Sequence, residues 1–112
     1  MRAALLPLVL LALPAAAQEV DLELVLLADA SGSIRADELA FQREGYAEAL
    51  TSPEVLAAIA SNFTGTIALA YVEWAADTAV VVDWTLIDGP AAAGRFADEL
   101  RAMPRLAFGR NA

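Results

Sequence analysis

The chain has 112 residues, a formal net charge of −8 and no cysteine or histidine, and its seven basic residues are all arginine. This composition excludes a disulfide framework, a thiolate or histidine metal site and a Ser-His-Asp triad within the chain. The acidic balance also argues against a nucleic-acid partner, because such a surface repels phosphate backbones.

The first 17 residues are typical of an export signal. Arg2 gives a positive start, residues 3–13 form an apolar run broken only by Pro7, and Ala15–Ala17 supply the small residues for cleavage before Gln18. The apolar stretch is shorter than the ~20 residues that cross a bilayer as a helix. We therefore expect a periplasmic or secreted chain with no stable membrane span after cleavage; an uncleaved anchor is the alternative.

The mature chain, residues 18–112, predicts alternating strands and helices. The apolar run over residues 20–28 is typical of a strand in a sheet that is covered on both faces, and Ser52-Pro53 marks the start of a second helix. The short link over 75–77 predicts that the strands on either side of it are antiparallel neighbours. The expected elements are a strand at 20–28, helices at 36–50 and from Pro53, strands at 66–74 and 79–87, and a helix at 91–103. The order predicts an α/β sheet with one antiparallel edge strand.

Apolar residues recur at helical spacing and define the expected core faces. These residues are Leu39, Tyr46 and Leu50 in the first helix, Val55, Leu56, Ile59 and Phe63 in the second, and Phe96, Leu100 and Met103 in the third. Arg43 lies on the first of these faces, where we expect a buried stem and a solvated head. We expect Trp84 to pack on the last helix, with a partner contact as the alternative.

Three oxygen-bearing side chains follow the first strand. Asp29, Ser31 and Ser33 form an Asp-x-Ser-x-Ser string in the turn before the first helix. Ligands of open α/β sheets bind beyond the carboxyl ends of the strands, and carboxylate and hydroxyl oxygens suit Mg²⁺ or Ca²⁺, with Mn²⁺ also compatible. The same residue types are also common in turns and at helix starts, so a purely structural turn stays open.

The sequence from Leu24 to Ser33 closely resembles the first part of the metal-ion-dependent adhesion site of von Willebrand factor type A domains. Later segments, at 42–46, 71–74, 84–87 and 108–111, look like a bacterial exported subfamily whose function is not established. The resemblance implies a Rossmann-like, mostly parallel sheet with helices on both faces and one antiparallel edge strand. It covers nearly the whole mature chain.

The resemblance also implies how an ion is held. In the family, two serines bind it directly, a threonine comes from a second loop, and aspartates act through water. Asp29, Ser31 and Ser33 match the first motif. The threonine is expected just after Asn111, where the sequence has Ala112, and the third-loop aspartate has no counterpart. Because domains of the family are longer, residues 18–112 are interpreted as an incomplete domain.

The leading functional hypothesis is a non-enzymatic module that binds an acidic side chain of a protein partner through the cation. A truncated or structural remnant of such a domain is one alternative. The other is a magnesium-dependent phosphoryl-transfer enzyme with Asp29 as nucleophile. That chemistry calls for a carboxylate at Ser31 and a later lysine, and the chain has neither. Glu73 is expected to be a solvated strand end, with a role near the ion as the alternative.

Overall fold

The computed structural model describes residues 17–110, which form an α/β fold with a three-stranded mixed sheet and three helices. The predicted signal lies outside the described residues, apart from Ala17. The elements are β1 (Leu22–Asp29), α1 (Ala36–Leu50), α2 (Pro53–Ala60), β2 (Ile67–Trp74), β3 (Thr78–Ile87) and α3 (Pro90–Ala102). Each begins and ends within two residues of its prediction where one was made, which confirms the predicted order.

The sheet has the strand order β1-β2-β3. Strands β1 and β2 are parallel, from the pair Leu22↔Ile67 to the pair Asp29↔Trp74. Strands β2 and β3 are antiparallel, which confirms the predicted antiparallel edge strand. The register therefore brings the carboxyl ends of β1 and β2 and the start of β3 to one end of the sheet.

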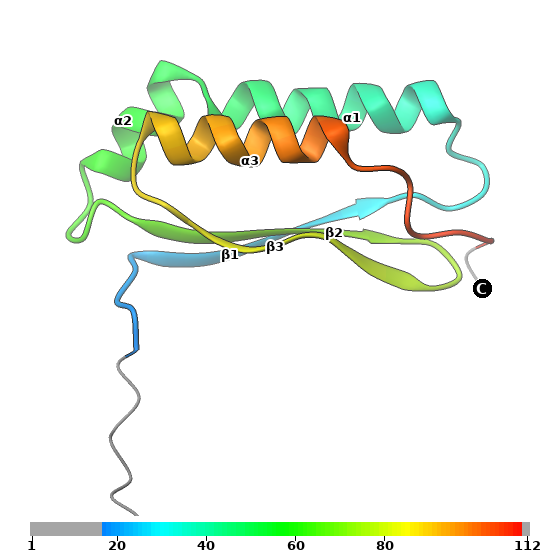
Figure 1. Cartoon of the computed structure of the whole chain (residues 1–112), viewed down its shortest axis with the longest axis horizontal. Coiled ribbons are helices and arrows are strands. Elements are labelled where there is room, and N and C mark those ends of the chain that lie inside the picture. Colours follow the sequence, from blue (N-terminus) through cyan, green and yellow to red (C-terminus); the bar gives the residue numbers. More distant parts are fainter. Residues whose placement is uncertain (1–16, 111–112) are drawn as a thin grey trace, which may run out of the picture.

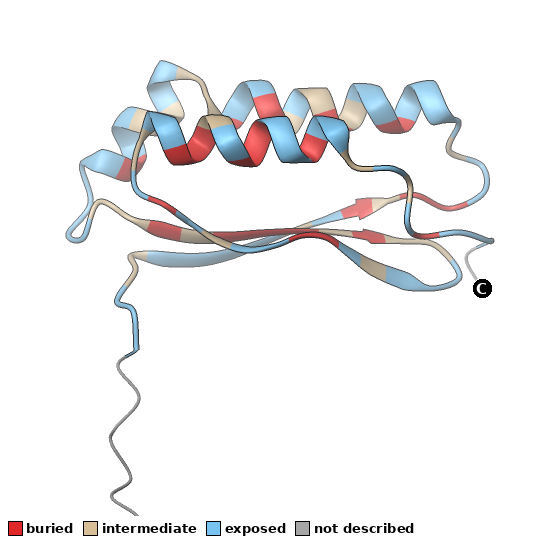
Figure 2. Cartoon of the chain, in the orientation of Figure 1, coloured by how far each residue is buried: buried red, intermediate tan, exposed pale blue. Residues whose placement is uncertain are grey.

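All three helices lie on the same face of the sheet (Figure 1). Figure 2 shows that the buried residues concentrate between this helical layer and the strands. The largest side chains of this main core are Tyr71, Phe96, Leu69, Ile87 and Leu100, all nearly inaccessible to solvent. The predicted core faces of α1 and α3 are confirmed, since Leu39, Leu50, Phe96 and Leu100 are buried.

The other face of the sheet carries large exposed apolar side chains. Alternation along the strands turns Val25, Leu27, Val80 and Leu86 away from the helices, and they are 44–59% exposed. Within residues 17–110 no helix covers this face, so the expectation of a sheet covered on both faces is not met there. Trp84 is 53% exposed and belongs to neither buried cluster of the described residues, so the expected packing on the last helix was wrong.

Phe63 was also wrongly assigned to the core. Helix α2 ends at Ala60, and the chain then turns through Gly65, whose φ is 66°. Phe63 consequently lies beyond the helix and is 98% exposed.

Within residues 17–110, none of the helices has both the length and the apolar character that crossing a membrane requires.

Candidate metal centre

The loop that follows β1 is held in place by backbone hydrogen bonds. The amide of Ala30 donates to the carbonyl of Trp74 at 2.8 Å, which extends the β1–β2 pairing past Asp29. The amide of Ser31 donates to Oδ1 of Asp29 at 2.8 Å. The amide of Ile34 donates to the carbonyl of Ser31 at 2.8 Å and closes a turn over Ser33. The three predicted ligand residues therefore lie together at the carboxyl end of β1.

The two serine hydroxyls are spaced as neighbouring ligands of one cation would be. Ser31 Oγ lies 3.5 Å from Ser33 Oγ; Ser31 is buried and Ser33 is exposed. Two oxygens at right angles on one ion are about 3.0 Å apart for magnesium and about 3.4 Å apart for calcium, given metal–oxygen distances of about 2.1 and 2.4 Å. The observed spacing is close to the calcium value, and for magnesium the two oxygens would have to approach by about half an ångström, which requires rotation of a serine side chain about its Cα–Cβ bond.

Asp29 is the acidic member of the loop, and its pKa is lowered below 3.8, first by the Ser31 side chain and then by the Ser31 amide. The carboxylate therefore keeps its negative charge at neutral pH. In the described part of the chain, no three acidic side chains gather into a metal-binding cluster. One carboxylate and two neutral hydroxyls cannot neutralise a dication, so an ion held here would attract a further anion.

The segment 108–110 packs beside this loop. The amide of Gly32 donates to the carbonyl of Gly109 at 2.9 Å, and the amide of Ala76 donates to the carbonyl of Phe108 at 3.2 Å. The φ of Gly109 is 95°, and a Cβ on this residue would lie 2.8 Å from Cβ of Ala76. This contact therefore requires glycine at position 109. It places the chain around Gly109 directly beside the loop that follows β1, residues 29–34, which is the Asp29 loop. The expected second-loop position, residue 112, lies outside the described residues.

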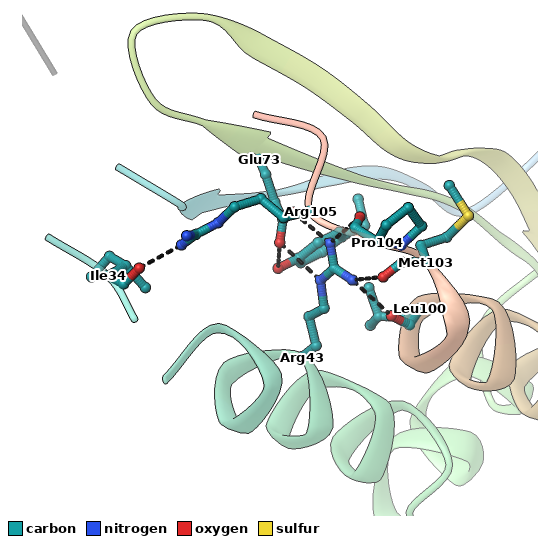
Figure 3. Close-up of polar contacts among 8 residues, drawn as sticks. Ile34, Arg43, Glu73, Leu100, Met103, Pro104 and Arg105 are labelled. Atoms are coloured by element: carbon teal, nitrogen blue, oxygen red, sulfur yellow. Dashed lines mark hydrogen bonds and ion pairs between the residues drawn. The ribbon is translucent and has the colours of Figure 1, made fainter. Parts of the chain in front are cut away.

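Glu73 is fully buried, and the expectation of a solvated strand end was wrong. Its carboxylate binds the Arg43 guanidinium with two hydrogen bonds, from Nε at 2.9 Å and from Nη2 at 2.6 Å (Figure 3). It accepts a third hydrogen bond from Tyr71 Oη at 3.0 Å. The side chains of Arg43 and Glu73 are 6% and 0% exposed. The expected solvated head of Arg43 was therefore wrong as well, because α1 carries its guanidinium into the core beside β2.

The Arg43 guanidinium also binds the chain after α3. It donates to the backbone carbonyls of Leu100, Met103 and Pro104 (Figure 3). Burial lowers the pKa of Arg43, but the hydrogen bond and the charge of Glu73 outweigh it and the pKa is raised. The network thus joins α1, β2 and the end of α3 through one buried ion pair. The only sequence signals for it were an arginine on an apolar helix face and a glutamate in an apolar strand.

The model of one protein family matches residues 19–112, and its description is "protein of unknown function (DUF1194)". The chain belongs to DUF1194. No curated protein and no solved structure matches the chain.

The DUF1194 match includes both parts of the candidate centre. It spans the Asp29 loop and the segment around Gly109 that packs against it. It also includes the Arg43–Glu73 pair. The description of DUF1194 assigns no activity.

Proposed function

We propose that this member of DUF1194 is a divalent-cation-dependent protein-binding module and not an enzyme. The observation that carries the proposal is the arrangement of Asp29, Ser31 and Ser33 at the carboxyl end of β1, with the two hydroxyls 3.5 Å apart. The ion is Ca²⁺ or Mg²⁺, with Mn²⁺ also fitting the oxygen ligands. The partner supplies an acidic side chain that completes the coordination.

The fold supports an adhesion-site type of centre. We propose that the described α/β unit is part of a von Willebrand factor type A-like domain of Rossmann-like topology. Its support is the parallel β1–β2 pair with β3 as antiparallel edge strand, and a ligand loop at the end of β1. The contact of Gly32 with Gly109 adds to this, because it brings a second segment beside the ion-binding loop.

The charge of the loop supports a binding role. A dication held by Asp29 alone keeps a net positive charge, so it attracts a carboxylate from another molecule. The rest of the chain is strongly acidic, with a net charge of −8. The cation therefore determines where on this surface an acidic partner binds, and its removal should abolish the interaction.

The residue inventory supports binding over catalysis. The chain has no histidine, cysteine or lysine, which are common general bases and nucleophiles of enzymes. Ser31 also stands where phosphoryl transfer through an aspartyl intermediate calls for a second carboxylate.

Isothermal titration calorimetry with calcium and magnesium chloride tests the cation site. Wild-type protein should bind one ion, and Asp29→Ala should lose that binding. Asp88→Ala is the matched control, because Asp88 is an exposed aspartate directly after β3, at the opposite end of the sheet. Heat that is absent in the wild type, or unchanged by Asp29→Ala, would overturn the cation site.

The partner's role is tested with two synthetic peptides of otherwise neutral sequence, one carrying a single glutamate and the other glutamine. The glutamate peptide should bind in calcium and lose its binding in EDTA, whereas the glutamine peptide should not bind in either. Equal binding of both peptides, or binding of the glutamate peptide that persists in EDTA, would refute a carboxylate bound through the ion.

A further inference from the structure

A cavity of about 390 Å³ lies between α1 and the segment that follows α3. Three arginines border it, Arg43, Arg101 and Arg105, and Glu44 is the single acidic residue in its described lining. The whole chain carries a net charge of −8. The charged residues of the cavity lining are therefore mainly positive, opposite in sign to the net charge of the chain.

Two of these arginines are neutralised by carboxylates. Arg43 holds the buried carboxylate of Glu73. Arg101 binds Glu44 with two hydrogen bonds of 2.8 Å, from Nε and Nη2. Neither guanidinium therefore contributes an uncompensated charge to the cavity.

Arg105 is different. Its Nη2 donates to the carbonyl of Ile34, and Figure 3 shows the side chain reaching toward that residue. Its Nε is buried and has no acceptor among the described residues, and no carboxylate in residues 17–110 lies within ion-pair distance of the guanidinium. A buried donor without an acceptor is unfavourable. Arg105 thus brings one positive charge without a carboxylate partner to the wall of the cavity. Because its Nε is inaccessible to solvent, a ligand in the cavity would meet the terminal nitrogens of the guanidinium.

We propose that this cavity binds a small organic carboxylate, with its anionic end on Arg105 and its apolar part against Leu39 and Met103. The volume lies in the range of small-molecule sites. A planar guanidinium matches the geometry of a carboxylate. A single uncompensated charge balances a monocarboxylate and leaves a phosphate dianion under-neutralised, and the apolar wall residues favour a ligand with a hydrocarbon body. Binding here needs no cation at Asp29, although Arg105 contacts the turn after Ser33 through the carbonyl of Ile34.

The test is a titration of the ¹⁵N-labelled protein with sodium butyrate, followed by NMR of the arginine Nε–H signals. Sodium chloride at matched ionic strength and inorganic phosphate are titrated in parallel. Butyrate should shift the Arg105 signal saturably, chloride should not, and phosphate should bind at least tenfold more weakly than butyrate. No saturable shift, an equal shift with chloride, or tighter binding of phosphate would overturn the proposal.

Variants separate a binding role from a structural one. Arg105→Gln should abolish the butyrate-dependent shifts of backbone amides around Leu39, and Arg105→Lys should weaken them because the fork is lost while the charge stays. Arg95→Gln is the matched control, because Arg95 is an exposed arginine of α3 outside the described lining. Amide spectra without butyrate establish that each variant is folded. Butyrate shifts that persist in folded Arg105→Gln would refute the assignment.

Discussion

Replacing Glu73 by glutamine should remove a large part of the stability of this fold. The substitution keeps the shape of the side chain but leaves the buried Arg43 guanidinium, whose side chain is 6% exposed, without a counter-charge. Removing one partner of a buried ion pair costs about 3–5 kcal/mol. That is a substantial fraction of the roughly 5–15 kcal/mol by which domains are stable. Urea unfolding followed by circular dichroism measures the loss.

The exposed pair Arg101–Glu44 provides the control. Its side chains are 40% and 43% exposed, so Glu44→Gln should cost less than about 1 kcal/mol. A Glu73→Gln protein that loses no more free energy of unfolding than Glu44→Gln would refute the reasoning.

Three further predictions concern two glycine positions and pH. Gly45→Ala should stabilise the fold by about 0.5–1 kcal/mol, because Gly45 lies within α1 and an added Cβ meets no atom within 4 Å. Gly109→Ala should destabilise the fold by more than about 1 kcal/mol, given a φ of 95° and a Cβ 2.8 Å from that of Ala76. Urea unfolding measures the change in free energy of unfolding for both variants. A Gly109→Ala protein of unchanged stability would contradict the packing beside the Asp29 loop. Because the pKa of Asp29 is lowered below 3.8, its carboxylate stays charged as the pH falls to that value and is protonated only below it. Calcium affinity by calorimetry should therefore be constant from about pH 7 to about pH 5, and a midpoint of loss above pH 5 would contradict the assignment of Asp29 as the ligand.

Local sequence patterns were sufficient to predict the order of the elements. The turn residues 75–77 predicted the antiparallel pairing of β2 and β3, and the Ser52-Pro53 pair predicted the start of α2. Both the tight β2–β3 connection and the start of α2 are determined by residues that are neighbours in the sequence, so the local sequence is sufficient to predict them. The prediction that Phe63 is buried was wrong because Phe63 fits the helical spacing of α2 but lies beyond the end of that helix at Ala60.

Long-range packing was beyond the sequence pattern. Glu73, the partner of Arg43, lies 30 residues away in β2. The local sequence around either residue does not predict that the two side chains pair. An apolar strand pattern likewise indicates that residues such as Val25 and Leu27 can be buried, but it does not tell what covers them. That Asp29, Ser31 and Ser33 share one turn was predictable because they lie within five residues of one another, whereas the contact of this turn with Gly109 required the fold.

Manganese-induced broadening in NMR spectra tests most directly that Asp29, Ser31 and Ser33 converge on one cation. Substoichiometric Mn²⁺ added to the ¹⁵N-labelled protein should first broaden the amide signals of residues 31–33 and of Gly109, and excess Ca²⁺ should restore them. Broadening that begins at exposed carboxylates such as Asp88, or that Ca²⁺ does not reverse, would contradict a cation site at the end of β1.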